Sequence, residues 1–198
     1  MIRVFEDAAA LDLPLPRGSR VAVKPNLTAT RHRPGVTTTP ALLERVLSLL
    51  KDNGNRVTVV ESDGGYGAWK CEQAFEGHGI PAMAGRLGVA VVNLSAAPAR
   101  DLAVDTVRGE IAIPFPAMLM DDVDAFVTLP VPKVHCMTGV SLAMKNQWGL
   151  IPDPLRLHHH HAFDAAILAI NRRLPAARAI VDGTWFLDRK STRLNSSH

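Results

Sequence analysis

The stretch from residue 21 to residue 61, VAVKPNLTATRHRPGVTTTPALLERVLSLLKDNGNRVTVVE, decides the fold of this chain. Its first residues, 21–27, form a β-branched run typical of a buried strand, which breaks at Pro25 and leads into a loop. Pro40 then suits the first turn of a helix, and Gly54 ends that helix. The helical spacing is carried by Leu42, Leu43, Val46, Leu47 and Leu50. A second β-rich run closes a strand, helix, strand unit, which predicts a parallel sheet with a right-handed crossover.

The rest of the chain continues the same alternation of strands and helices. It predicts two helical pieces within 68–87 separated near 77–81, strands at 89–94, 124–130 and 177–185, helices at 138–148 and 163–174, and paired β-rich pieces around Arg108 and Gly109. We therefore expect one α/β domain over residues 1–188, with a mostly parallel sheet and flanking helices in a Rossmann-like three-layer arrangement. A small β-hairpin is inserted near 101–116.

The charge balance gives no support for a nucleic-acid partner. Lys and Arg number 22 against 19 Asp and Glu, but Arg189, Lys190 and Arg193 lie in the last ten residues, which contain no acid. Without that tail the balance is 19 against 19. The tail, 189–198, has no apolar periodicity and resembles translated adapter sequence. We expect it to be non-native or disordered, with the natural protein continuing past Asp188 and the domain incomplete at its carboxyl end.

Cys71 and Cys136 are the only cysteines of the sequence, too few for an iron–sulfur cluster or a zinc ribbon within this chain. No uncharged apolar run approaches a membrane span, and the first residues lack the long apolar segment of a secretion signal. These observations predict a soluble, cytoplasmic protein with no membrane partner.

Four predicted strands deliver polar residues just beyond their carboxyl ends. In open parallel α/β sheets that edge is where ligands bind. We therefore expect these residues to line one site. They are Lys24 and Asn26, Asp63 and Gly64, Lys133 and His135, and Asp182 and Gly183.

The segment 130–152, PVPKVHCMTGVSLAMKNQWGLIP, adds Lys145 and Asn146 to this edge. Together with VAVKPNL, the helix that follows it and AIVDG at 179–183, it resembles the family known as domain of unknown function 362. The resemblance implies the α/β fold and these pocket residues. Members of that family are sometimes fused to, or encoded with, ferredoxin-like iron–sulfur modules. Where the family commonly has a second lysine and a threonine, this chain has Val131 and Val134.

The clustered cations predict a small anionic ligand, carrying phosphate or carboxylate, bound by an enzyme. Lys24, Lys133 and Lys145 would neutralise it, because ammonium groups gathered at one edge repel one another without an anion. His135 would transfer a proton, and Asn26 and Asn146 would orient the ligand. Asp63 or Asp182 would act as a base or as a metal ligand. Gly64 would provide a turn, and Thr38 would provide a helix N-terminus. The structural alternative is that Lys24–Asp63 and Lys145–Asp182 are ion pairs.

Two further functions stay open at this point. The first is a redox-accessory or binding module without catalysis of its own, in which an iron–sulfur cluster enters only through a ferredoxin-like partner or a missing segment. The second is a divalent-metal protein that uses the histidine run 158–161, with His161 and His158 as ligands and His161 nearest the site.

Overall fold

The computed structural model describes residues 13–135, 138–175 and 177–185. The predicted tail at 189–198 lies outside the described residues, as does Cys136. A five-stranded sheet forms the centre, and all its neighbouring strands run parallel. In spatial order the strands are β3 (Ala90–Asn93), β2 (Arg56–Glu61), β1 (Arg20–Pro25), β6 (Ala125–Leu129) and β9 (Arg178–Ala179). The predicted parallel α/β sheet is confirmed.

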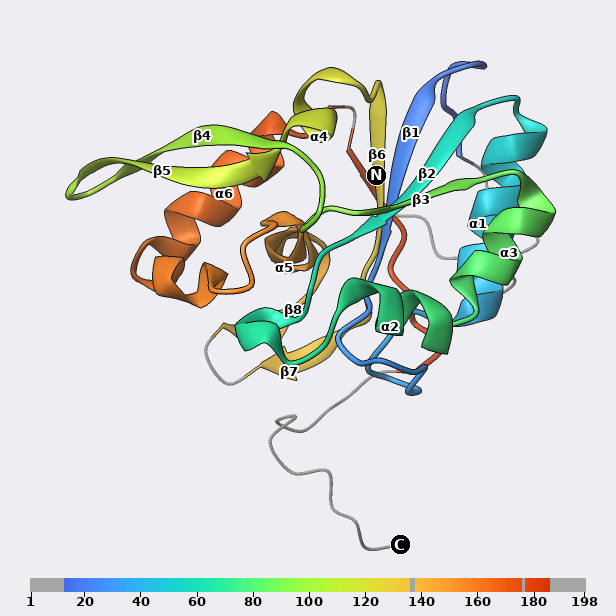
Figure 1. The fold of residues 1–198 in the computed structure, drawn as a ribbon, viewed down its shortest axis with the longest axis horizontal. Coiled ribbons are helices and arrows are strands. Elements are labelled where there is room, and N and C mark those ends of the chain that lie inside the picture. The colour runs from blue at the N-terminus through green and yellow to red at the C-terminus, as the bar shows by residue number, and fades with distance from the viewer. Residues whose placement is uncertain (1–12, 136–137, 176, 186–198) are drawn as a thin grey trace, which may run out of the picture.

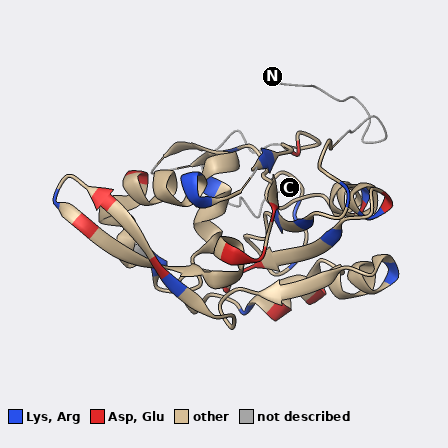
Figure 2. Cartoon of the chain, turned by 90° about the horizontal axis from the view of Figure 1, so that it is seen from above, with Lys and Arg blue, Asp and Glu red and all other residues tan. Residues whose placement is uncertain are grey.

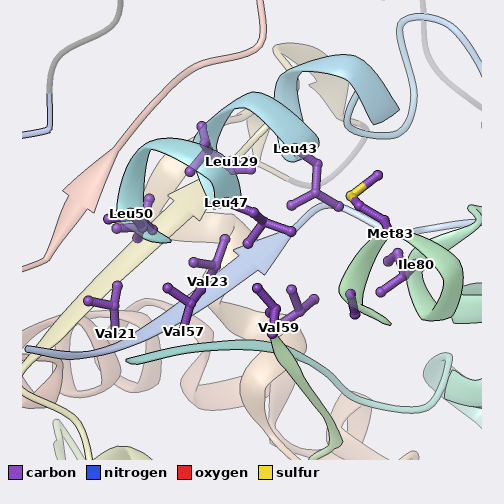
Figure 3. Packing of buried hydrophobic residues seen from close by; sticks show 14 of the residues in the cluster. Val21, Val23, Leu43, Leu47, Leu50, Val57, Val59, Ile80, Met83 and Leu129 are labelled. Atoms are coloured by element: carbon purple, nitrogen blue, oxygen red, sulfur yellow. The ribbon is translucent and has the colours of Figure 1, made fainter. Parts of the chain in front are cut away.

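One face of the sheet is covered by three helices, α1 (Pro40–Asp52), α2 (Cys71–Gly77) and α3 (Ile80–Leu87). Alternate residues of the strands point to this side, so Val21 and Val23 of β1 meet Leu47 of α1 in a buried cluster (Figure 3). Burying each such side chain contributes roughly 1.5–3 kcal/mol. The apolar residues spaced along 40–52 therefore form the buried face of a helix, as predicted. The predicted break near 77–81 is also present, between α2 and α3.

The opposite face is covered by the hairpin β4 (Ala99–Thr106) and β5 (Gly109–Pro116), by α4 (Ala117–Asp121), by the 3-10 turn η3 (Gln147–Leu150), and by α6 (Phe163–Arg173). Ala22 and Phe126, which alternate with the residues of the first face, are fully buried there. Figure 1 shows the two sets of elements on either side of the sheet. The three-layer arrangement and the inserted hairpin are both confirmed.

Two predicted elements are wrong in detail. A helix was expected over 138–148, but the structure has a short antiparallel hairpin, β7 (Lys133–His135) and β8 (Gly139–Ser141), before the one-turn helix α5 (Ala143–Asn146). Gly139 takes a φ of +69°, a turn conformation that glycine adopts without strain. The expected strand at 177–185 forms ladder contacts at Arg178–Ala179.

The strand order creates a switch point between β1 and β6. From β1 the chain moves to β2 and β3 on one side, and later returns to place β6 on the other side of β1. In open α/β sheets the crevice at the carboxyl ends of such a pair of strands is the usual ligand position. Charged side chains of both signs are spread over the helices, the hairpin and the loops (Figure 2). In the described part of the chain, no helix has the length and apolar character to cross a membrane.

Candidate functional site

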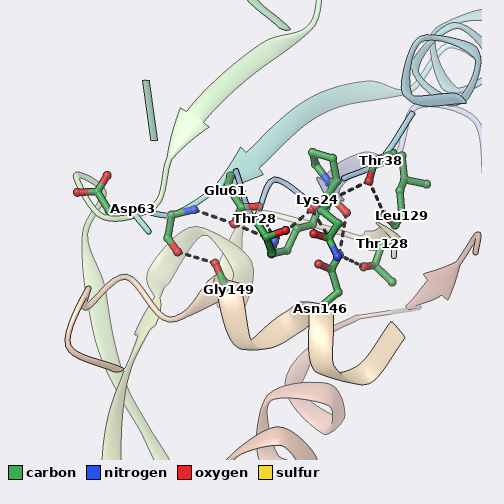
Figure 4. Close-up of polar contacts among 12 residues, drawn as sticks. Lys24, Thr28, Thr38, Glu61, Asp63, Thr128, Leu129, Asn146 and Gly149 are labelled. Atoms are coloured by element: carbon green, nitrogen blue, oxygen red, sulfur yellow. Dashed lines mark hydrogen bonds and ion pairs between the residues drawn. The ribbon is translucent and has the colours of Figure 1, made fainter. Parts of the chain in front are cut away.

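A buried ion pair between Lys24 and Glu61 lies beneath the carboxyl edge of the sheet. Lys24 Nζ lies 2.8 Å from both carboxylate oxygens of Glu61, and the two residues are 2% and 4% exposed (Figure 4). The predicted partner, Asp63, is therefore wrong. Glu61 ends a strand whose other buried residues are all valines, and that placement was the available sequence signal. Because Glu61 already compensates its charge, we assign Lys24 to the buried scaffold beneath the site and not to ligand contact.

Gly149 closes over this ion pair. A Cβ at this position would lie 3.1 Å from Lys24 Nζ and 3.2 Å from Glu61 Oε1. The carbonyl of Gly149 also accepts a 2.6 Å hydrogen bond from Ser62 Oγ, which fixes η3 against the end of β2 (Figure 4). This glycine, three residues after Asn146, is thus explained by the close approach of its backbone to the buried ion pair.

Asn146 ties α5 to the ends of β1 and β6. Its Nδ2 donates to Thr128 Oγ1 at 2.8 Å, and at 3.4 Å to the carbonyl groups of Lys24 and Pro25 (Figure 4). The amide nitrogen predicted to orient a ligand therefore holds the scaffold instead. Because Lys145 precedes it on the same helical turn, Asn146 fixes the position of Lys145 at this edge.

Asn26 and Thr38 form a second tie at the same edge. Thr38 Oγ1 accepts a 2.7 Å bond from Asn26 N and donates a 2.6 Å bond to Leu129 O, which joins the ends of β1 and β6 (Figure 4). Thr38 N returns a 3.0 Å bond to Asn26 O. With its backbone held in this way, Asn26 presents Oδ1 to Lys133 Nζ at 3.2 Å.

Asp63 and Gly64 serve the start of α2. Burial alone would raise the pKa of Asp63, but hydrogen bonds from Lys70 Nζ at 2.8 Å and Cys71 N at 2.9 Å outweigh it and lower that pKa. A Cβ on Gly64 would lie 2.7 Å from the Trp69 ring, so packing explains this glycine. Arg156, which sequence reasoning missed, is buried and donates to Asp63 O at 2.9 Å.

Asp182 occupies the N-terminus of α1. Its Oδ2 accepts a 2.7 Å bond from Thr39 N and its Oδ1 a 3.2 Å bond from Thr184 N. At the helix N-terminus that Thr38 was expected to offer to an anion, the backbone amide of Thr39 thus meets a carboxylate of the chain itself. Both oxygens of Asp182 thus bond backbone amides, and the alternative ion pair between Lys145 and Asp182 stays a prediction.

Cationic side chains converge where β7 leaves the switch point. Lys133 Nζ donates to Val36 O at 2.7 Å and to Asn26 Oδ1 at 3.2 Å. Burial, and then the positive charges of Lys145 and Lys24, lower its pKa to about 8. Burial likewise lowers the pKa of His135, with further lowering from Lys145, Lys133 and His160. We call Lys133, His135, Lys145 and His160 the cationic cluster.

An aromatic wall adjoins the cationic cluster. The rings of Trp148 and Phe163 lie 4.7 Å apart, and each is 5.5 Å from the ring of His160. Lys145 Nζ lies 6.0 Å from the centre of the Phe163 ring, within cation–π range. The histidine that joins the site is therefore His160, whereas His158 and His161 are exposed.

Comparison with known proteins identifies the family. A sequence model described as "Domain of unknown function (DUF362)" matches residues 21–194. This chain belongs to that family. The DUF362 chain is also similar in fold to a crystal structure of a protein from Thermotoga maritima, with a TM-score of 0.50 and 16% identity. The likeness covers 83% of this chain and 47% of the other, so the chain spans about half the length of that protein. No curated protein matches.

The candidate residues of this DUF362 domain come from two separate elements near the switch point. Lys133 and His135 come from β7, and Lys145 comes from α5, which packs against β6. Val131, at the place of the family's second lysine, is 1% exposed. In the segment between β6 and the end of β7 in this DUF362 domain, the ammonium group therefore comes from Lys133.

The histidine run lies in a 3-10 segment, η4 (Arg156–Ala162). His161 Nδ1 lies 3.0 Å from His158 O, a contact within this segment. Over residues 13–135, 138–175 and 177–185, no group of three or more His, Cys, Asp or Glu side chains is arranged to hold a metal ion.

Proposed function

We propose that this DUF362 domain is an enzyme that binds a small anion, carrying phosphate or carboxylate, in the crevice between the carboxyl ends of β1 and β6. The observation that carries the proposal is the pair of hydrogen bonds made by Lys133. Both of its acceptors, Val36 O and Asn26 Oδ1, are neutral oxygens. By contrast, Lys24 meets Glu61 and Lys70 meets Asp63 at 2.8 Å.

The energetics of the cationic cluster favour an anionic ligand. Lys133 is half-buried. An ammonium group that loses part of its hydration is costly unless it is paired, and each nearby positive charge adds to that cost. An ammonium has three N–H donors, and the two protein acceptors of Lys133 leave one for a ligand. A phosphate or carboxylate group would therefore restore the charge balance and complete the hydrogen bonds of Lys133.

Each member of the cluster has a role that suits its place. Lys133 and Lys145 would neutralise the anion from two sides of the crevice. The imidazole of His135, whose lowered pKa favours the neutral form, would accept and return a proton. Trp148 and Phe163 would exclude water from one side, which strengthens charge interactions there.

Binding of inorganic phosphate by the whole chain tests the proposal. Isothermal titration calorimetry on the wild type and on Lys133→Met should show an affinity at least about tenfold weaker in the variant, since one charge-assisted bond contributes roughly 1.5–3 kcal/mol. Lys51→Met is the matched control. It also removes one lysine, but Lys51 lies at the far end of α1 and bonds Gly88 O. Equal affinity of all three proteins would contradict the proposal.

A second measurement needs no substitution at the site. A bound anion stabilises the imidazolium form, so phosphate should raise the pKa of His135 above its value in the free protein. Nuclear magnetic resonance titration of the histidine rings measures this change directly. An unchanged His135 at saturating phosphate would place the anion elsewhere.

A further inference from the structure

The hydrogen bonds of Lys133 also define how its neutral form would be oriented. A neutral amine has two N–H donors and one lone pair. Val36 O and Asn26 Oδ1 provide acceptors for both N–H groups, at 2.7 Å and 3.2 Å. The lone pair then takes the remaining tetrahedral direction, free of competition from the two acceptors. This is the arrangement that a nucleophilic amine requires.

We infer that Lys133 is a nucleophile that forms an imine with an aldehyde or ketone carried by the anionic ligand. The inference rests on the proposed function, because the anionic group, bound by Lys145 and by the ammonium form of Lys133, would bring the carbonyl carbon close to Nζ. Attack would then follow when Lys133 releases its third proton and exposes the lone pair. It adds a chemical class to that function: the ligand is an oxo acid or a phosphorylated carbonyl compound.

The groups that face Lys133 favour its neutral form. Lys24 and Lys145 contribute positive charge from β1 and α5, whereas the charge of Glu61 opposes them from β2. Burial is the largest influence, and together these effects lower the pKa of Lys133 to about 8. Lys70 shows the opposite case, since its hydrogen bond to Asp63 raises its pKa. At pH 7.5 about a quarter of Lys133 would be neutral, against roughly one part in a thousand for an ordinary lysine.

The proposed step balances without an oxidant or reductant. The lone pair of Nζ attacks the carbonyl carbon, and the π electrons of the C=O bond move to oxygen. His135 takes one proton from nitrogen and returns it to that oxygen, which gives a carbinolamine. Transfer of the second nitrogen proton to the same oxygen releases water, and the nitrogen lone pair forms the C=N bond.

Reductive trapping with glyoxylate, a small anionic aldehyde, tests the inference. The whole chain is incubated with glyoxylate at pH 7.5, reduced with sodium borohydride and mapped by peptide mass spectrometry. We expect the adduct on Lys133 in at least about tenfold excess over exposed lysines, with a half-maximal yield near pH 8. Lys133→Arg keeps the charge but cannot form the imine, so it should lose this adduct, whereas Lys51→Arg should keep it.

Two comparisons separate the imine from the anion site. Acetaldehyde lacks a carboxylate and should label Lys133 several-fold less than glyoxylate, and inorganic phosphate should protect Lys133 from glyoxylate. An even spread of adduct over the lysines would overturn the inference. Lys133 left unlabelled while calorimetry still detects phosphate would overturn the imine alone, and loss of both would overturn the proposed function too. The wild-type labelling needs no variant to fold.

Discussion

Glu61→Gln should strongly destabilise this protein, because it leaves Lys24 charged and uncompensated in the core. The substitution keeps the size and shape of the side chain. It also keeps one oxygen, which can still accept from Ser62 N at 3.1 Å. What it removes is the negative charge and the second acceptor, since the new amide nitrogen would face Lys24 Nζ with donors on both sides.

The magnitude follows from the burial of both partners. Lys24 is 2% exposed and Glu61 is 4% exposed, so water cannot replace the lost partner without a change in the fold. Removing one partner of a buried ion pair typically costs about 3–5 kcal/mol. That is a large fraction of the roughly 5–15 kcal/mol by which small domains are stable. We therefore expect a large fall in the urea midpoint with little change in the slope.

The assay is equilibrium urea unfolding of the wild type, Glu61→Gln and Glu44→Gln, followed by circular dichroism. Glu44 is the matched control, because it also pairs with a cation, Arg86, at 2.7 Å, but on the surface. An exposed pair contributes at most about 1 kcal/mol. A third variant, Lys24→Met with Glu61→Met, removes both charges and should recover much of the stability lost in Glu61→Gln.

The reasoning is refuted if Glu61→Gln costs no more than Glu44→Gln. It is also refuted if the double variant is less stable than Glu61→Gln, because the cost would then arise from packing and not from an uncompensated charge. If Glu61→Gln does not fold at all, recovery of a folded protein by the double variant still decides between these explanations.

Two more predictions concern the same edge of the sheet. Burial, with the charges of Lys145 and Lys24, lowers the pKa of Lys133 to about 8. Between pH 8 and pH 10.4 this lysine is therefore protonated in the unfolded chain but mostly neutral in the folded protein. The free energy of unfolding should rise by on the order of 3 kcal/mol over this range. Lys133→Met should remove this rise, and parallel pH profiles of the two proteins would contradict it. Gly149→Ala should destabilise by about 1–3 kcal/mol, because its Cβ would lie 3.1 Å from Lys24 Nζ. Gly85→Ala, inside α3 with no described atom within 4 Å of the new Cβ, should stabilise by about 0.5–1 kcal/mol. If the urea midpoints of Gly149→Ala and Gly85→Ala both rise or both fall relative to the wild type, this prediction is wrong.

The sequence was sufficient to predict those strands and helices whose local residue pattern matches the side that they bury. The runs at 21–25 and 56–61 are buried strands, and the leucine spacing of 40–52 is a helix against them. The element at 133–141 could not be predicted in this way. Its strands have three residues each, too few for a period of two to be distinguished from a helical turn.

Partners of polar side chains were the harder problem. Sequence reasoning placed Lys24, Asp63, Asp182 and Asn146 at one edge. In the structure Lys24 lies near the end of β1, Asp63 and Asp182 follow β2 and β9, and Asn146 ends α5. Which groups then bond depends on distances of a few ångströms between strands far apart in the sequence. A carboxylate at the last position of β2 pairs with Lys24, whereas Asp63, two residues later, has turned toward α2.

These pairings separate the polar residues of this edge into two groups. Asp63 and Asp182 each neutralise the N-terminus of a helix, Glu61 neutralises Lys24, and Asn146 and Thr38 join the ends of β1 and β6. The polar residues that the sequence suggested as one large site thus divide into a rigid scaffold and a small remainder. That remainder is the cationic cluster at the switch point, where Lys133 is held by neutral oxygens close to other positive charges. Under the proposed function a bound anion would neutralise this cation, so we expect phosphate to raise the urea midpoint of the wild type and to have a smaller effect on Lys133→Met.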